Sequence, residues 1–469
     1  MKQFITHLTL TTVFLSLLLS CKSTNKEGVI STLKSTSKTL TYAVNGDTFQ
    51  NSWTVSPEVK PDRLNVECVN EQNTVAFVSD IDSLTFNVKI NDTIRFIVLL
   101  NNKDTALTEI IGVPKNTNFS AEYIHEHKGK LEVAIPEVHE LANVLTAISK
   151  IGQIDSNMVD MNTPYYKAVI KHFLPFVNHP LIDTINHNIT GVSDVKSYWY
   201  YYALKMNACG YEFENDGQIS NKGIIRKMGF SGNEDPLIKN KKLMEDFARK
   251  SNFRDFYKSH QSYYDSLITI YQQLNPIDKM QKWLENKFGF EYGNYTVLFS
   301  PLVGGAHSTN KFKDNNFEQT FMFVCRAEYS PKYNRNVNEM LESRIVFTEI
   351  DHNFVNPLSD KKIDLINKVF DNRKKWTTEG NGTSAYPNAY SVFNEYMTWG
   401  IFSLYCLDNF PEKDAKQFIQ KMENQMTDNR HFIKFKKFNQ QLINVYKSNS
   451  NISMNDLYDK ALKWCEGKK

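Results

Sequence analysis

The sequence predicts an α+β protein in which a small N-terminal β-domain precedes a larger, mainly helical domain. Around residues 84–90, apolar and polar side chains alternate as they do in half-buried strands. After Pro136 the apolar residues recur every three or four positions, the spacing of amphipathic helices. With 469 residues, of which 41% are hydrophobic and 23% charged, the chain is long enough for two or three domains and a large core.

The charge and cysteine content exclude some classes of protein. The net charge is +3 and no long basic or acidic block occurs, so nothing predicts a nucleic-acid partner. None of the six cysteines forms a C-x-x-C pair, which argues against a zinc knuckle or a redox motif. Cys21 apart, the cysteines are scattered and odd in number, which indicates buried free thiols rather than a disulfide framework.

The first residues predict export and a lipid anchor. Residues 1–20 combine Lys2 with an apolar run over 13–19 that is too short to span a bilayer. The run ends in Leu-Leu-Ser before Cys21, which resembles the lipobox of bacterial lipoproteins; the alternative is an ordinary signal peptide with an incidental cysteine. The resemblance implies lipidation of Cys21 and attachment to a membrane of the bacterial cell envelope, on its periplasmic or cell-surface face. Residues 21–37 are polar and are predicted to be a lipidated tether.

Residues 38–122 are predicted to form the β-domain. Leu84, Phe86, Val88 and Ile90 alternate with polar residues, and residues 74–78 and 94–100 are further apolar strands. No catalytic constellation occurs here, so we expect a spacer or a recognition module. His125 and His127 follow in a segment that we interpret as a solvated connector, although two histidines two residues apart on a strand are able to bind a metal ion.

The larger domain is predicted to cover residues 130–469. His139-Glu140 on its first helix is a near match to H-E-x-x-H, but His139 lies off the apolar stripe and is expected at the surface. Strands are predicted at 292–300 and 318–328, with His307 on a flexible loop between them. A helix from about Asn336 is predicted to end before Pro357. Another helix covers 390–407.

The candidate site lies on these last two helices. Thr348 and His352 stand four residues apart, on one face of the first helix, with Glu349 between them. Glu395 follows on the second helix, 43 residues after His352. In zinc peptidases two histidines at this spacing bind the metal, and the glutamate after the first activates the bound water. Here Thr348 occupies the position of the first histidine, and a threonine hydroxyl is a poor zinc ligand.

This order of strands, motif helix and glutamate helix resembles the gluzincin metallopeptidases. The pattern also resembles the bacterial lipoprotein family of domain of unknown function 4932, through Phe354-Val355-Asn356-Pro357 and Asn394-Glu395-Tyr396. The resemblance covers residues 130–469. It implies a peptide-bond hydrolase with zinc as cofactor, Glu349 as general base and His352 and Glu395 as metal ligands. Tyr386 or Tyr390 would donate to an oxyanion in an active relative.

The loss of the first histidine leaves several hypotheses open. In the first, the site is inactive and binds a peptide or protein. In the second, His307 or Asp351 supplies a third metal ligand. In the third, Glu349 and His352 perform acid-base chemistry without a metal ion, and in the fourth they are only a buried pair whose polar atoms are satisfied. A di-iron site needs a second E-x-x-H, which the chain lacks. We therefore expect a membrane-anchored lipoprotein with a degenerate metallopeptidase-like domain, impaired or inactive as a peptidase. The alternative is a non-enzymatic, peptide- or glycan-binding surface lipoprotein.

Overall fold

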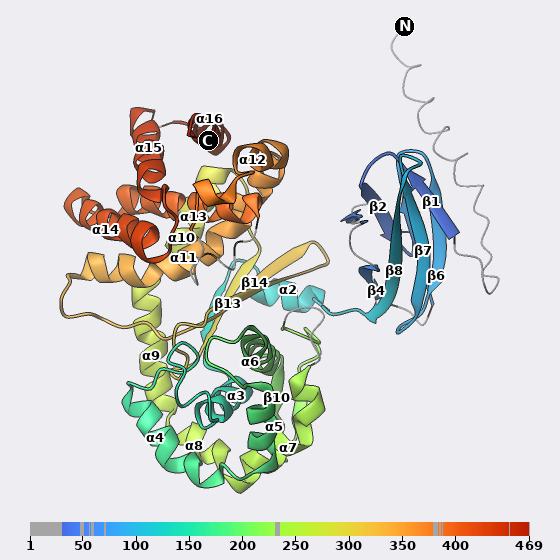
Figure 1. Ribbon diagram of the computed structural model, residues 1–469. Helices are drawn as coiled ribbons and strands as arrows, with labels where there is room; N and C mark the ends of the chain where they lie inside the picture. Colours follow the sequence, from blue (N-terminus) through green and yellow to red (C-terminus); the bar gives the residue numbers. More distant parts are fainter. Residues whose placement is uncertain are drawn as a thin grey trace, which may run out of the picture. The chain divides into compact units, whose positions relative to one another are not determined.

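The computed structural model confirms the α+β class and divides the chain into two units, residues 1–116 and 117–469 (Figure 1). It describes residues 31–46, 51–55, 57, 61–69, 72–229, 235–378, 383, 386, 388–449 and 451–468. The predicted signal peptide and Cys21 lie outside these residues. The first unit ends at Asn116, whereas the sequence predicts that the β-domain ends at residue 122.

The described residues of the N-terminal unit form two four-stranded sheets, in the orders β1-β7-β8-β4 and β3-β2-β5-β6. Their strands are β1 Ser31–Ser35, β2 Thr39–Val44, β3 Asn51–Thr54, β4 Asp62–Cys68, β5 Asn73–Val78, β6 Ser83–Val88, β7 Thr93–Leu100 and β8 Asp104–Pro114. Strand β1 pairs in parallel with β7. The prediction of a tether as far as residue 37 is therefore wrong from Ser31 onward, because this polar segment completes a sheet edge with backbone hydrogen bonds.

The two sheets share one apolar core. Phe77 and Phe86 from one sheet meet Phe96 from the other, with ring centroids 5.4 and 5.1 Å apart. Phe86 and Val88 point inward, as the alternation predicts. Ile90 lies beyond the end of β6 and is exposed.

The second unit is built around a mixed sheet with the order β13-β14-β12-β9. Its strands are β9 Leu131–Ala134, β12 Asn294–Phe299, β13 Ser308–Asp314 and β14 Phe317–Val324. Strand β12 pairs in parallel with β9 and β14, and β13 pairs antiparallel with β14. Strand β13 begins inside the segment predicted as a loop, so His307 directly precedes an edge strand.

Helices α3–α8 gather on one side of β13 and β14, and α10–α16 on the other (Figure 1). The first group follows the short helix α2 Ala121–His127 and includes a small hairpin, β10 Tyr211–Phe213 and β11 Ile219–Asn221. Its helices are α3 Glu137–Ala147, α4 Pro164–Phe173, α5 Pro180–Asn188, α6 Val195–Ala208, α7 Pro236–Lys250 and α8 Phe253–Ser259, followed by α9 Gln261–Leu274. Helix α3 is buried on every side, so His139 is fully buried and its predicted surface position is wrong.

The second group holds the candidate site. Its helices are α10 Ile277–Phe288, α11 Arg335–Asp360, α12 Ile363–Val369, α13 Ala389–Asn409, α14 Glu412–Asn424, the π-helix η4 Gln425–Asn429, α15 Phe435–Ser448 and α16 Met454–Glu466. Helix α11 continues through Pro357, so the prediction that it ends there is wrong. The exposed proline removes one backbone donor, and buried Phe354, Val355 and Ser359 hold the last turns in place.

Two further findings concern the cysteines and the lengths of the helices. Cys68, Cys209, Cys406 and Cys465 are buried free thiols, as predicted, whereas the free thiol of Cys325 is only partly buried. Among the described residues, no helix combines the length and apolar content that a membrane span requires.

Candidate functional site

Helices α11 and α13 pack against each other and bring the predicted site residues into one region. Helix α11 is fixed at its start by Asn334, which caps it by accepting from the Val337 amide at 2.9 Å. Asn353 on α11 donates to Thr320 of β14 at 3.2 Å, which ties the helix to the sheet. Helix α13 begins with a capping box formed by Asn388 and Ser391.

Glu349 lies where α11 faces the edge strand β13. Its Oε2 accepts a hydrogen bond of 2.5 Å from the hydroxyl of Thr309. The carboxylate is half-buried. Burial of the Tyr202 phenol on α6, and then the charge of Glu349, raise the pKa of Tyr202 to about 12. Glu349 therefore lies within electrostatic reach of both helical groups.

His352 takes part in a chain of polar contacts that joins α11 to α13. Its Nδ1 lies 3.3 Å from Oδ1 of Asn356, and the same oxygen accepts from Asn394 Nδ2 at 3.0 Å. The half-buried imidazole is thus oriented by an amide from its own helix, which is in turn held by the neighbouring helix. Asn356 and Asn394 therefore have a structural role here, because their hydrogen bond joins α11 to α13.

Glu395 is engaged by a cation. Its Oε1 accepts from Arg430 Nη1 at 2.6 Å and from the indole of Trp399 at 2.8 Å, and the residue is 4% exposed. Arg430 follows η4 and also donates to the hydroxyl of Tyr386 at 2.9 Å. The guanidinium lies 5.1 Å from the Trp399 ring, so it is held by charge, hydrogen bonds and stacking together.

Asp351 adds a third acid to this region. It is fully buried, and neither of its oxygens has a hydrogen-bond partner among the described residues. Burial, with Glu395 and Glu349 nearby, raises the pKa of this carboxyl well above its usual range. Burial and the neighbouring carboxylates therefore disfavour the charged form of Asp351, which is the form that binds a metal ion.

The donors present do not fit a three-ligand zinc site. Thr348 is buried and donates its hydroxyl to the Ile345 carbonyl at 3.0 Å. The carboxylate of Glu395 is paired with the Arg430 guanidinium, so one of its oxygens is already engaged by a cation. Among the residues that the structure describes, no group of three His, Cys, Asp or Glu side chains is arranged to hold a metal ion.

The other residues weighed from the sequence have local roles. His125 and His127 lie on helix α2 rather than on a strand, and His127 stacks on Tyr123 at 3.8 Å. Tyr386 contacts Arg430, as described above, and Tyr390 donates to Asp360 at 2.7 Å. The sequence analysis missed Thr309 and Arg430. Neither has a motif around it, and only their distances to Glu349 and Glu395 reveal them.

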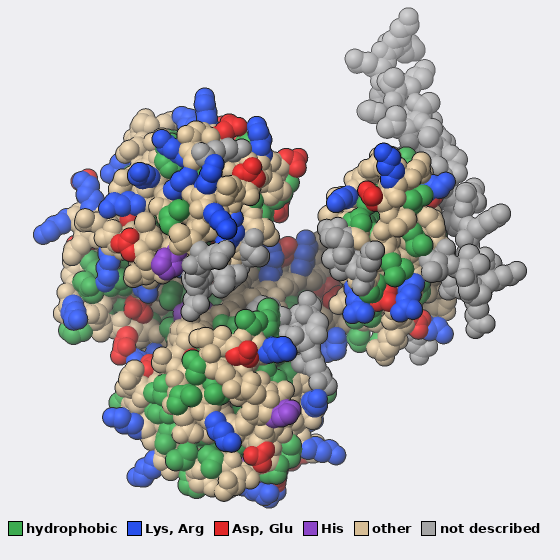
Figure 2. Space-filling model, viewed as in Figure 1, with side chains coloured by type: hydrophobic (Ala, Val, Ile, Leu, Met, Phe, Trp, Pro, Cys, Tyr) green, Lys and Arg blue, Asp and Glu red, His purple; other side chains and the backbone are tan. Residues whose placement is uncertain are grey.

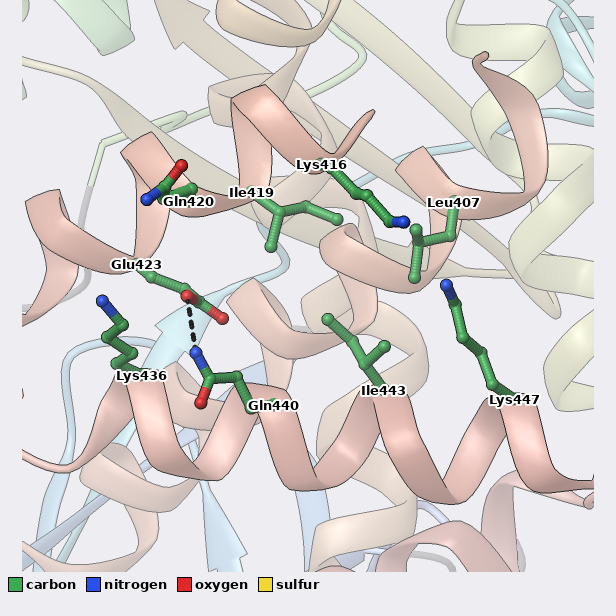
Figure 3. A pocket seen from close by; sticks show the side chains of 9 residues that line it. All are labelled: Leu407, Lys416, Ile419, Gln420, Glu423, Lys436, Gln440, Ile443 and Lys447. Atoms are coloured by element: carbon green, nitrogen blue, oxygen red, sulfur yellow. Dashed lines mark hydrogen bonds between the residues drawn. The ribbon is translucent and has the colours of Figure 1, made fainter. Parts of the chain in front are cut away.

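Two hollows lie away from this site. One, of about 430 Å³, lies between α2, the sheet and α9, and is lined by aromatic residues that include Tyr123, Tyr257 and Phe321. The other, of about 320 Å³, is a groove between α14 and α15 with an apolar floor and three lysines (Figure 3). At one end of the groove Gln440 donates to Glu423 at 3.3 Å. Glu349, His352 and Glu395 line neither hollow.

The comparisons with known proteins add no family to this description. No family model matches the chain, and neither a curated protein nor a solved structure does.

Proposed function

We propose that this protein is a membrane-anchored lipoprotein of the bacterial cell envelope whose helical unit is metallopeptidase-like and inactive as a peptidase. The observation that carries the proposal is the ion pair between Glu395 and Arg430. Arg430 pairs with Glu395, the residue expected to bind zinc. Thr348 stands at the position where a zinc peptidase has its first histidine ligand. The anchor rests on the lipobox-like sequence before Cys21.

An impaired peptidase site keeps the surroundings that bind a peptide. Glu349 retains one carboxylate oxygen that accepts no hydrogen bond from a described side chain, beside the edge strand β13. An edge strand offers backbone donors and acceptors to an added strand. We therefore expect a peptide ligand that is bound and released unchanged.

Metal content tests the proposal directly. Elemental mass spectrometry is applied to a chain of residues 22–469, beside Glu395→Ala, Thr348→His and the double variant Thr348→His/Arg430→Met. We expect almost no zinc in the first three and close to one zinc per chain in the double variant, because it regains an imidazole and frees Glu395. Circular dichroism checks that each variant is folded.

Two outcomes of the metal analysis would contradict the proposal of an inactive, peptidase-like protein. One zinc per chain in the unmodified protein, lost in Glu395→Ala, would make an active peptidase the better hypothesis. No zinc in the folded double variant at micromolar metal would argue against peptidase ancestry.

The second candidate function, a non-enzymatic lipoprotein that binds a peptide or glycan, would then be the better hypothesis. The aromatic hollow beside Tyr123 and Tyr257 favours that candidate, since ring faces and a few polar groups commonly line ligand sites.

A further inference from the structure

The aromatic hollow between α2, the sheet and α9 is large enough to hold a small molecule. Its volume is about 430 Å³, which falls in the range of ligand pockets, whereas ordinary protein cores leave few voids larger than a water molecule. The sheet contributes Ala134 of β9, Thr296 and Leu298 of β12 and Phe321 of β14 to the lining. This sheet lies between the two groups of helices, where Figure 2 shows the surface of the helical unit recessed.

Aromatic rings line the hollow on two sides. Tyr123 and His127 of α2 stack on each other with their ring centroids 3.8 Å apart. Tyr257 of α8 and Tyr264 of α9 lie on the other side, with ring centroids 5.1 Å apart. Aromatic rings attract one another by about 0.5–1.5 kcal/mol beyond the area that they bury. The lining therefore favours a planar ring over a saturated group of the same size.

The hydroxyl groups of these tyrosines are already paired within the protein. Tyr123 donates to the side chain of Gln319 at 2.8 Å, and Tyr257 donates to the carbonyl of Ile135 at 2.6 Å. The hydroxyl of Tyr264 bonds a neighbouring tyrosine hydroxyl at 2.6 Å. Among the described residues of the lining, no fully buried side-chain nitrogen or oxygen lacks a hydrogen-bond partner. An apolar ligand therefore leaves no polar group of the lining unsatisfied.

The charged side chains of the lining balance each other. Glu132 and Lys222 are both exposed, and they contribute one charge of each sign. The third titratable group, His127, lies 3.9 Å from Glu132 through its Nε2. With His127 neutral, the lining has no net charge that would compensate an ion drawn out of water, and burial of an unpaired ion is costly. The lining therefore favours an uncharged ligand.

We infer that the aromatic hollow binds an uncharged, planar group of two or three fused rings. A cavity of about 150 Å³ is able to bind benzene, and this hollow is almost three times as large. Displacing poorly ordered water from an apolar hollow by an apolar group increases affinity. The ring belongs either to a free compound or to the indole of a tryptophan in a peptide. The ring site rests on its own lining, and only a peptide source would rest on the second candidate function.

Calorimetric titration of the chain of residues 22–469 tests the ring site. The probes are 2-naphthol, its saturated analogue decahydro-2-naphthol, the anion 2-naphthoate and the glycan maltotriose. We expect 2-naphthol to bind with a dissociation constant below about 1 mM, and about two- to tenfold more tightly than the saturated analogue. We expect 2-naphthoate to bind at least about tenfold more weakly than 2-naphthol, because its charge would be buried without a partner. Maltotriose should not bind.

A substitution that fills the hollow locates the site. Ile268 of α9 is half-buried and lines the hollow, so Ile268→Trp should weaken 2-naphthol binding by at least about tenfold. Ile270→Trp is the matched control, because Ile270 is half-buried on the same helix and does not line the hollow. Thermal unfolding checks that both variants are folded. Tyr257→Leu is a second, smaller change, which should remove most of the preference for 2-naphthol over its saturated analogue.

Two further probes distinguish the sources of the ring. Binding of an acetylated and amidated tripeptide with a central tryptophan, at least as tight as binding of indole, would assign the ring to a peptide. Binding of indole without binding of this tripeptide would assign it to a free compound.

Four results would overturn the inference, whatever the metal analysis shows. These are no binding of 2-naphthol at millimolar concentration, or binding that Ile268→Trp leaves unchanged in a folded protein. Equal affinity for 2-naphthol and its saturated analogue would exclude recognition of a planar ring. Tighter binding of 2-naphthoate than of 2-naphthol would exclude an uncharged ligand.

Discussion

Replacing Arg430 with methionine is the sharpest test of the reasoning about the candidate site. Methionine keeps an unbranched apolar stem and removes the guanidinium. Glu395, 4% exposed, would then keep its bond from Trp399 and lose its cation. Asp351 and Glu349 lie nearby, so the remaining carboxylate would be buried among acids rather than bases.

The expected cost follows from the burial of the pair. Removing one partner of a buried ion pair typically costs about 3–5 kcal/mol, because an uncompensated charge is left behind. The exposed fraction of the Arg430 side chain is only 22%, so solvent screens this pair weakly. For a unit of roughly 350 residues, the unfolding entropy is about 0.7 kcal/mol/K. Arg430→Met should therefore lower the unfolding midpoint of the helical unit by about 4–7 °C.

A double-mutant cycle measured by urea unfolding isolates the pair. Glu395→Gln should cost less than Arg430→Met, because Arg430 keeps Tyr386 and some solvent. The double variant should be more stable than Arg430→Met alone, with a coupling energy of about 2 kcal/mol or more. Arg335→Met, at the exposed start of α11, is the control and should change stability by less than about 0.5 kcal/mol. A loss below about 1 kcal/mol in Arg430→Met, or additive losses, would refute the pairing.

Three further predictions concern other parts of the chain. Burial raises the pKa of Glu140 from 4.5 to about 7, so the folded state binds more protons than the unfolded one between these values. Stability should therefore fall by about 3 kcal/mol as pH rises from 4.5 to 7, and urea unfolding of Glu140→Gln should lack most of that slope. Gly112→Ala would place a Cβ 2.0 Å from the Lys89 carbonyl oxygen, so calorimetry should show the N-terminal unit destabilised by about 3 kcal/mol and the helical unit unchanged. Pro357→Ala should stabilise the helical unit by about 1–3 kcal/mol by restoring a backbone bond inside α11, and a lower midpoint would contradict this.

Local patterns predicted individual elements well. The alternation around Phe86 and Val88 places both residues in the core of a strand, because side chains on a strand point to opposite faces in turn. The helices that carry Glu349 and Glu395 were also predicted, since an apolar face repeats with the period of a helix. Both patterns depend on neighbours within one element, so one sequence suffices to find them.

The same local rules failed where packing decided the outcome. His139 was expected at the surface, but α3 is enclosed on all sides and has no solvent face. Pro357 was expected to end a helix, but the loss of one backbone bond is smaller than what the buried side chains on either side of it contribute. The strand that follows His307 was missed because β13 is an edge strand, in which polar residues are normal.

By itself the sequence determined the α+β class, the order of the β-rich and helical parts and the placing of Thr348, Glu349 and His352 on one helix. Only the tertiary structure decided what these residues meet. Arg430 reaches Glu395 across 35 residues of sequence, and Lys205 reaches Ala306 across 101. No periodicity encodes such contacts, because they depend on how helices pack against one another. The charge that a buried side chain meets is a property of that packing, and it determines whether an acid binds a metal ion or an arginine.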